Sequence, residues 1–598
     1  MSPAAPRRPP RAGIAYRVEV ADANAHRFRV TLRVQRPAAE QRLSLPVWIP
    51  GSYLVREFAR HLSGLEAHQE GRAIELRQLD KASWLARCRG SAALTVSYFV
   101  HAFDVSVRSA YLDARRGFFN GTSLCLRVHG REDEPHALAL GGLPAGWEVA
   151  SAMPAGVQRN EFVAADYDEL VDHPFELGRF WRGHFDAGGV AHEFVVAGAL
   201  PGFDPARLLA DAQRICATQI AFWHGAGAAR AELPFARYLF LLNAVDEGYG
   251  GLEHRASTAL IANRRDLPSA AGAGGEPGDG YVKLLGLVSH EYFHAWNVKR
   301  LRPAEFAQLD YAKENYTRLL WFFEGFTSYY DDLLLRRAGL IDASRYLKLV
   351  ATTVSGVLGT PGRKLQSLAA ASFDAWVKYY RPDENTPNAT VSYYTLGSLV
   401  ALALDLELRG AGKAGASLDA VMRKLWQASR GGPVSEDDIV AAVAATAGRA
   451  RGAALGARLR AWVHGTDDLP LPELLARFGV RWREQAPTLA QRWGLRVAES
   501  ALTGVRVTHV LRDGAAEAAG LAAGDELLGV EGWRLRRLDD ALPLLPVKGG
   551  ARLVVSRDQR LLELSIATPA TATGAVQLAL DEDASAASRA LRKAWLHA

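Results

Sequence analysis

Residues 287–303 read LVSHEYFHAWNVKRLRP, and this stretch decides which type of domain lies at the centre of the chain. Two histidines, His290 and His294, stand four positions apart around Glu291. Residues four apart lie on one face of an α-helix, so both imidazoles can reach a single metal ion. Apolar residues on both sides of the pair predict that this helix is buried. The competing interpretation is a pair of core histidines that bind no metal.

A catalytic zinc ion needs three protein ligands and keeps a fourth position for water. Glu314, in YAKENYTRLL, follows the second histidine by 20 residues, and Glu324, in LLWFFEGFTSYY, follows it by 30. Spacing favours Glu314, but context favours Glu324, because a carboxylate among aromatic side chains is costly unless a metal compensates its charge. We expect Glu324 to be the third ligand. Glu291 is rotated off the ligand face, where a general base belongs.

The length of 598 residues is too great for a single hydrophobic core and predicts several domains. Segments such as RFRVTLRV alternate between apolar and polar residues and indicate a β-rich N-terminal domain, whereas apolar residues at three- and four-residue spacing indicate a mainly helical middle. The predicted fold class is therefore multidomain α+β. The predicted segments are a flexible tail at 1–13, a β-rich domain at 14–180, a catalytic domain at 181–483, a small β domain at 484–568, and a tail with one helix at 569–598.

The stretch LPVWIPGSYLVREFARHL interrupts the β pattern of the N-terminal domain. Pro46, Pro50 and Gly51 break the alternation, and the residues after them could form one helical turn. We interpret the stretch as a packed crossover, in preference to an edge that faces a substrate.

Composition excludes several classes of protein. The 71 basic and 65 acidic residues give a net charge of +6 and are scattered, so nucleic-acid binding is not expected. We found no apolar stretch near the roughly 20 residues of a membrane span and no apolar run typical of a signal peptide, so the expected location is cytoplasmic. Cys88, Cys125 and Cys216 are far apart and are expected to be ordinary buried thiols.

Four motifs together resemble the glycyl aminopeptidase family of zinc metallopeptidases, which have a thermolysin-like, or gluzincin, catalytic domain. The motifs are HEYFHAWNVKRLRP, YGGLEH, WFFEGFTSYY and YYTLGSLVALAL, and the resemblance extends from about residue 14 to about residue 567. It implies a metallopeptidase with one zinc ion, held by His290, His294 and Glu324. Glu291 would accept the proton of the water that the zinc activates.

The resemblance also assigns residues that bind the substrate. Related zinc aminopeptidases bind the free α-amino group with the glutamate of a Gly-x-Met-Glu-Asn segment, and GGLEH places Glu253 in that role with Gly250 and Gly251 before it. A carboxylate there would pair with an ammonium group and so select chain ends. The alternative is that Glu253 forms an ion pair with a surface arginine. The sequence departs from the motif at Leu252 and His254, which leaves the shape of the first pocket open.

A tyrosine that stabilises the oxyanion is also implied. In the relatives it stands three residues before a helix glycine, and YYTLGS places Tyr394 at that distance, with Tyr393 beside it. A phenol that donates a hydrogen bond to the developing negative charge is a sound physical role. The adjacent Tyr393 remains an alternative, as does a packing role for both. Leu396 stands where many relatives have lysine.

The C-terminal unit resembles a bacterial PDZ domain, through GVRVTHVLRDGAAEAAGLAAGDELLGVEG. PDZ domains add an extended peptide to a sheet edge and often bind its terminal carboxylate. The implied carboxylate loop and edge strand contain Gly494, Leu495, Arg496 and Val497. A domain kept only for packing or assembly is the alternative.

The activity implied is release of one N-terminal residue, glycine with alanine tolerated, from peptides that have a free N-terminus. Two other functions remain possible: a zinc endopeptidase guided by the PDZ domain, and a peptide-binding scaffold without catalysis.

Overall fold

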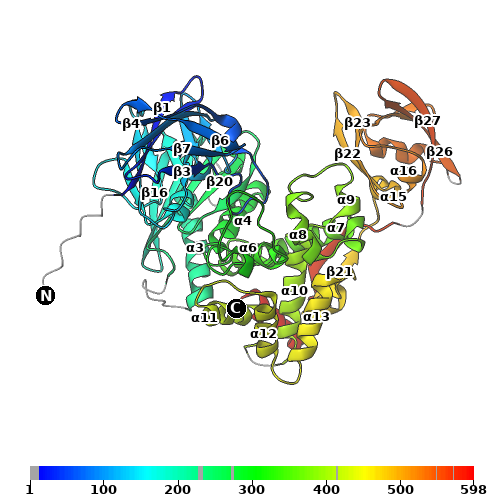
Figure 1. The fold of residues 1–598 in the computed structure, drawn as a ribbon. Helices are drawn as coiled ribbons and strands as arrows, with labels where there is room; N and C mark the ends of the chain where they lie inside the picture. Colours follow the sequence, from blue (N-terminus) through cyan, green and yellow to red (C-terminus); the bar gives the residue numbers. More distant parts are fainter. Residues whose placement is uncertain are drawn as a thin grey trace. The chain divides into compact units, whose positions relative to one another are not determined.

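A computed structural model describes residues 12–225, 233–270, 275–412, 415–546, 549–569 and 572–597 (Figure 1). The chain forms two compact units, Met1–Asn315 and Tyr316–Ala598. The predicted multidomain α+β class is confirmed, with a β-rich N-terminal part, a helical middle and a C-terminal β domain. The five predicted segment borders stay a prediction, and most of the tail at 1–13 lies outside the described residues.

The first unit begins with a seven-stranded mixed sheet. Strand β1 (Ile14–Asp22) pairs antiparallel with β2 (Arg27–Val34) and parallel with β12 (His136–Gly141). Odd and even residues of β2 alternate between exposed and buried, as its sequence pattern predicts. The remaining strands of this sheet are β14 (Glu161–Ala164), β8 (Leu94–His101), β4 (Leu62–Gln69) and β5 (Arg72–Ala73).

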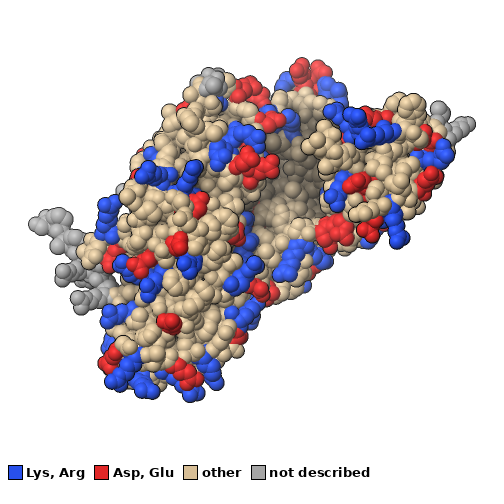
Figure 2. Space-filling view, turned by 90° about the horizontal axis from the view of Figure 1, so that it is seen from above, with Lys and Arg blue, Asp and Glu red and all other residues tan. Residues whose placement is uncertain are grey.

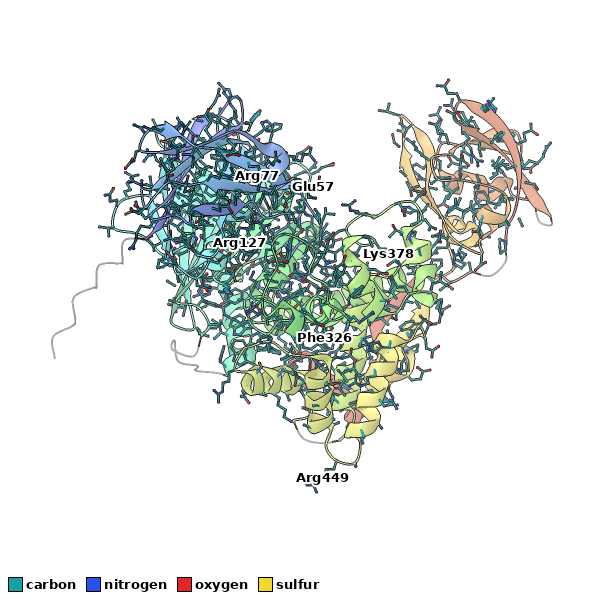
Figure 3. The ribbon with its side chains drawn as sticks, in the orientation of Figure 1. Glu57, Arg77, Arg127, Phe326, Lys378 and Arg449 are labelled. Carbon is teal, nitrogen blue, oxygen red and sulfur yellow. The ribbon has the colours of Figure 1, made fainter. Side chains whose placement is uncertain are left out.

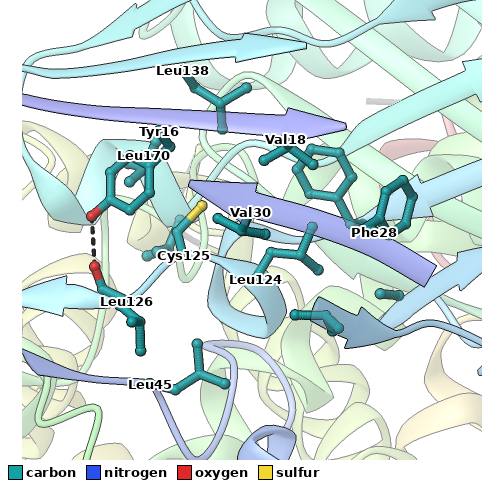
Figure 4. Packing of buried hydrophobic residues seen from close by; sticks show 14 of the residues in the cluster. Tyr16, Val18, Phe28, Val30, Leu45, Leu124, Cys125, Leu126, Leu138 and Leu170 are labelled. Atoms are coloured by element: carbon teal, nitrogen blue, oxygen red, sulfur yellow. Dashed lines mark hydrogen bonds between the residues drawn. The ribbon is translucent and has the colours of Figure 1, made fainter. Parts of the chain in front are cut away.

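Buried side chains of this sheet form the core of the N-terminal part. Figure 4 shows Tyr16, Val18 and Phe28 from β1 and β2 among them, with the Tyr16 hydroxyl donating to the Leu126 carbonyl at 2.6 Å. Cys125 lies in the same core, and burial raises the pKa of its thiol. All three cysteines are free thiols; Cys125 and Cys216 are buried, as expected, whereas Cys88 is only half-buried.

Two four-stranded sheets complete the β-rich part. One has the order β13 (Glu148–Ala150), β15 (Phe175–Gly178), β10 (Arg116–Phe119), β9 (Ala110–Leu112). The other has the order β11 (Arg127–Val128), β3 (Glu40–Ser44), β7 (Ser83–Arg87), β6 (Leu76–Asp80). Short helices follow at η1 (Phe58–His61), α1 (Gly121–Leu124) and α2 (Tyr167–Val171).

A five-stranded sheet completes the first unit and positions the HEYFH helix. Its order is β16 (Trp181–Ala187), β17 (Val190–Ala197), β18 (Arg237–Val245), β20 (Ser257–Asn263), β19 (Tyr249–Glu253). Strand β19 is the edge and runs antiparallel to β20. Two helices pack with this sheet, α3 (Pro205–His224) and α4 (Asp279–Phe293).

The second unit begins with helices. They are α5 (Leu320–Phe323), α6 (Gly325–Arg337), α7 (Ala343–Leu358), η6 (Pro361–Lys364), α8 (Leu368–Phe373), α9 (Thr386–Ala389), α10 (Thr395–Arg409), α11 (Leu418–Ser429), α12 (Glu436–Ala447), α13 (Gly452–His464) and α14 (Leu471–Arg477). Almost every residue of α10 is buried, which places it at the centre of this unit.

A small β domain follows the helices. Its sheet has the order β22 (Leu495–Ser500), β23 (Gly504–Val510), β24 (Glu526–Val530), β26 (Gly550–Arg557), β27 (Arg560–Ala567), with β25 (Trp533–Arg534) paired to β24. Its helices are α15 (Leu489–Trp493), α16 (Ala515–Ala518) and η8 (Leu538–Leu544). Beyond it, β28 (Val576–Leu580) pairs with β21 (Val480–Glu484), and α17 (Ala586–Leu596) is the predicted terminal helix.

Charged side chains of both signs are interspersed over the face that Figure 2 displays, with no large field of one sign. Within the described ranges, no helix is both long enough and apolar enough to cross a bilayer.

Candidate active site

Helix α4 carries the two histidines close together. The Nε2 atoms of His290 and His294 are 3.0 Å apart, as the four-residue spacing predicts. His294 is buried, and its Nδ1 lies 2.8 Å from the Asn297 carbonyl. A backbone carbonyl at Nδ1 fixes the proton there and leaves Nε2 as a ligand atom, which is the usual arrangement of a metal-binding histidine.

Contacts with the sheet and with α3 hold helix α4 in place. The Tyr292 hydroxyl lies 2.8 Å from His192 Nε2, while His192 Nδ1 lies 2.8 Å from the Val190 carbonyl. Burial lowers the pKa of His192 to about 4, so its ring is neutral. Nδ1 then donates a hydrogen bond to the Val190 carbonyl, and Nε2 accepts one from the Tyr292 hydroxyl. From α3, Gln219 donates to the Ser289 carbonyl at 2.7 Å.

Glu324 provides the third candidate ligand. It lies between α5 and α6 and is 2% exposed. Its neighbour in the chain is Phe323, and Phe326, two residues after Glu324, is labelled in Figure 3. Possible ligand atoms of His290, His294 and Glu324 all lie within 4.8 Å of one another. No other cluster of this kind occurs among the described residues, and Glu314 does not belong to it. Two imidazoles and a buried carboxylate suit a divalent cation, which would compensate the carboxylate charge.

Glu291 points from α4 toward the edge strand β19. It is 5% exposed, and a Cβ atom added to Gly251 would lie 2.1 Å from Glu291 Oε1. Gly251 therefore leaves the space that the carboxylate needs. Arg108 holds the same strand by donating to the Gly251 carbonyl at 3.1 Å.

Glu253 ends strand β19, two residues after Gly251, and is buried. Residues two apart in a strand share a face and lie about 7 Å apart, so Gly251, which adjoins Glu291, and Glu253 face the same side of β19. A Cβ atom added to Gly51, in the stretch that we expected to be a packed crossover, would lie 2.5 Å from Glu253 Oε1. Gly250 has a φ of +153°, a conformation that favours glycine.

A buried ion pair lies beside this strand. Lys299 Nζ is 2.6 Å from Asp172 Oδ1, and the Arg255 amide donates to Asp172 at 2.8 Å. Burial opposes the charge of Asp172, but Lys299 outweighs it and holds the pKa of Asp172 well below its usual value. Burial lowers the pKa of His254 against the opposing effect of Asp172. These groups tie the end of β19 to helix α2 of the N-terminal part.

Tyr394 precedes the first residue of α10. Burial, and next the Glu324 carboxylate, raise the pKa of Tyr394 well above its usual value, so its phenol stays protonated and can donate. Tyr393 is fully buried and stacks on Tyr394, with ring centroids 4.8 Å apart. The Glu324 charge acts on the Tyr394 phenol, and Tyr394 therefore stays the candidate donor at the site.

In the small β domain, Gly494 has a φ of +73° and ends helix α15. Leu495 is buried in the core of this domain, and Val497 packs partly against it. Arg496 points instead to the helical part, where it donates to the Gly359 carbonyl at 3.3 Å and to Thr360 Oγ1 at 3.4 Å. Strand β22, which contains three of the four residues, is an edge of its sheet.

The sequence motifs did not reveal three residues of this neighbourhood: Gly51, Arg108 and Asp172. Gly51 gave only a turn signal, Pro-Gly, and Arg108 and Asp172 gave none. Their roles arise from contacts with residues far away in the chain.

Comparison with known proteins gives the class of the chain. Family models match at residues 15–179 (Peptidase M61 N-terminal domain), 283–400 (M61 glycyl aminopeptidase) and 482–542 (PDZ domain). A crystal structure of a protein from Idiomarina loihiensis, described as an aminopeptidase N family protein, shares 37% identity and a TM-score of 0.90, covering 98% of this chain and 100% of that chain. Fold, site and matches together define a metallo-aminopeptidase. The chain belongs to the M61 glycyl aminopeptidase family, as the sequence motifs predicted.

A more distant structure is that of an M1 zinc metallopeptidase variant from Deinococcus radiodurans bound to a Tyr-Ser-Ala substrate. It shares 15% identity and a TM-score of 0.47, covering 77% of this chain and 95% of that chain. None of the curated proteins matches the sequence.

Proposed function

We propose that this protein is a zinc aminopeptidase that releases N-terminal glycine, and alanine more slowly, from peptides with a free N-terminus. One observation carries the proposal: strand β19 places Gly251 against the Glu291 carboxylate and Glu253 two residues further along the same face. A group that binds the substrate's ammonium would then lie about 7 Å along the strand from the residue that adjoins the general base. Such spacing suits removal of a single residue.

His290, His294 and Glu324 would hold one zinc ion, since their ligand atoms cluster within 4.8 Å. A zinc ion held there supplies Lewis acidity and lowers the pKa of a coordinated water to about 7. Glu291 accepts a proton from the attacking water and passes it to the leaving amine. The Tyr394 phenol donates to the oxyanion, and Glu253 pairs with the ammonium group of the substrate.

Glycine is proposed as the preferred residue because the family model that matches residues 283–400 describes a glycyl aminopeptidase. For the PDZ domain, we propose that the edge strand β22 receives the C-terminal segment of a peptide, with Gly494, Leu495, Arg496 and Val497 at the site.

The proposal is tested with coumarin amides of glycine, alanine and leucine, each free and N-acetylated. Wild type should cut the free glycine compound fastest and the acetylated compounds hardly at all. Glu291→Gln should lower kcat at least about 100-fold, the contribution of a general base, with unchanged zinc content by mass spectrometry. Glu253→Ala should raise KM for free substrates by about tenfold or more, the loss of a charge-assisted hydrogen bond.

Each alternative has its own outcome. Equal cleavage of free and acetylated compounds by wild type would show an endopeptidase. Normal peptide binding without bound zinc or turnover would show a scaffold.

A further inference from the structure

We propose that Gly51, from the N-terminal β-rich domain, positions the Glu253 carboxylate and so forms part of the subsite for the substrate's amino terminus. The inference rests on the proposed function, because it gives Glu253 the role of binding the ammonium group. Gly51 touches no reacting atom and is a positioning residue.

Residues 49–52, Ile-Pro-Gly-Ser, form a tight turn. The Ser52 amide donates to the Ile49 carbonyl at 3.0 Å, and Gly51 has a φ of +91°. Proline at the second position and a positive-φ glycine at the third are the signature of a type II turn. Glycine is therefore required by the backbone as well as by the surroundings.

The surroundings of Gly51 are occupied by Glu253. A Cβ atom added to Gly51 would lie 2.5 Å from Glu253 Oε1, 2.7 Å from Oε2 and 2.8 Å from Cδ. All three distances are shorter than real Cβ contacts, so a side chain at Gly51 would displace the carboxylate itself.

Neither backbone can easily move aside. On the Gly51 side, Trp48 is buried and donates to the Asp310 carbonyl at 2.8 Å, and the Val47 amide donates to the Tyr311 carbonyl at 2.9 Å. On the Glu253 side, β19 pairs with β20, and the His254 amide donates to the Ser257 carbonyl at 2.9 Å. A clash would therefore be resolved by rotation of the Glu253 side chain.

The first unit is open beside this contact. A pocket there, about 690 Å³ including space open to solvent, is lined in part by Pro50, Gly51, Tyr53, Glu253 and His254. The turn at 49–52 forms one wall of this pocket, and Glu253 and His254 belong to another part of its lining. The N-terminal domain thus takes part in selecting chain ends.

Gly51→Ala tests the inference, with Gly71→Ala as the matched control. Gly71 has a φ of +77° and no atom within 4 Å of an added Cβ, so it reproduces the backbone strain without the contact. For free glycine coumarin amide, Gly51→Ala should raise KM about tenfold or more, because a charge-assisted hydrogen bond is misplaced, with little change in kcat. Gly71→Ala should leave both constants near the wild-type values.

A second background separates positioning from a general loss of structure. Glu253→Asp withdraws the carboxylate by one methylene group, so Gly51→Ala should raise KM much less in that background. If Gly51→Ala alone does not fold, recovery of folding in the Gly51→Ala, Glu253→Asp double variant would support the contact. Failure of that double variant to fold would overturn the inference. Equal KM penalties in both backgrounds, or equal effects of Gly51→Ala and Gly71→Ala, would also overturn it. Equal cleavage of acetylated substrate by wild type would instead refute the proposed function.

Discussion

At the scale of single residues, the site depends on a glycine, whose lack of a side chain leaves room for a neighbouring carboxylate. Gly251 has no Cβ, and the space is taken by the Glu291 carboxylate, whose Oε1 would lie 2.1 Å from such an atom. A proton acceptor works only within hydrogen-bond reach of the proton it removes, so its position matters as much as its pKa.

Gly251→Ala should therefore lower kcat at least about 100-fold, the usual contribution of a general base, by displacing Glu291. Steady-state kinetics on free glycine coumarin amide measures the change, and metal content should stay unchanged. The control is Gly278→Ala at the start of α4, where an added Cβ meets no atom within 4 Å. A Gly251→Ala enzyme with near-normal kcat would show that Glu291 is not the base in this position.

The paired tyrosines can be separated by removing one hydroxyl at a time. Tyr394→Phe should lower kcat about 100-fold or more, the effect of losing an oxyanion donor, while KM changes little. Tyr393→Phe keeps a fully buried ring and should lower kcat by far less. Kinetics of the two variants side by side decides the assignment, and the reverse ranking would transfer the role to Tyr393.

How far these residues could be predicted depends on how local their signals are. The histidine pair is separated by four positions in one helix, so the sequence alone predicted its geometry. Glu324 was preferred over Glu314 from its aromatic neighbours, and it is the glutamate found near both histidines. Gly51 and Glu253 are about 200 residues apart, and no local pattern predicts that a turn and a strand end will meet.

At the scale of elements, helices α6 and α10 cross with almost no space between their backbones. A Cβ atom added to Gly397 would lie 2.7 Å from the Trp321 carbonyl oxygen and 2.9 Å from Gly325 Cα. Glu324 directly precedes α6, and Tyr394 directly precedes α10. This crossing thus brings together a candidate metal ligand and a candidate oxyanion donor.

Gly397→Ala should lower the free energy of unfolding by about 1–3 kcal/mol, because backbone atoms must move apart, and should also lower kcat. Gly356→Ala, in α7, should have the opposite sign, since an added Cβ there meets no atom within 4 Å. Alanine in an open helix position is expected to stabilise by about 0.5–1 kcal/mol. Thermal melting of both variants measures the difference, and a stable Gly397→Ala protein would contradict the tight crossing.

Element types were easier to predict than their pairing. RFRVTLRV alternates and became β2, but the parallel pairing of β1 with β12 joins residues more than 100 positions apart. Such a pairing depends on the whole fold, not on the local pattern. The C-terminal tail shows the same limit: its helix was predicted, whereas the strand β28 that pairs with β21 was not.

At the scale of the whole molecule, the PDZ domain is joined to the helical part of the second unit by Asn388. This buried side chain donates to the Val510 carbonyl at 2.8 Å and accepts from the Arg512 amide at 2.9 Å. Arg496 makes a second connection to Thr360. Asn388 lies six residues before Tyr394, so the segment that carries the candidate oxyanion donor also carries the contact with the PDZ domain.

Asn388→Ala should therefore loosen both ends of this segment. Losing two hydrogen bonds at a buried side chain costs about 1–3 kcal/mol, because the Val510 carbonyl and Arg512 amide lose their partner. Hydrogen exchange should become faster at residues 386–394 and 510–512, and kcat should fall modestly as Tyr394 is held less firmly. Asn385→Ala is the control, since Asn385 directly precedes the same short helix, is exposed, and makes no capping hydrogen bond with its side chain. If exchange became faster only at residues 510–512, with kcat unchanged, the PDZ domain would be attached to the catalytic segment without influencing it.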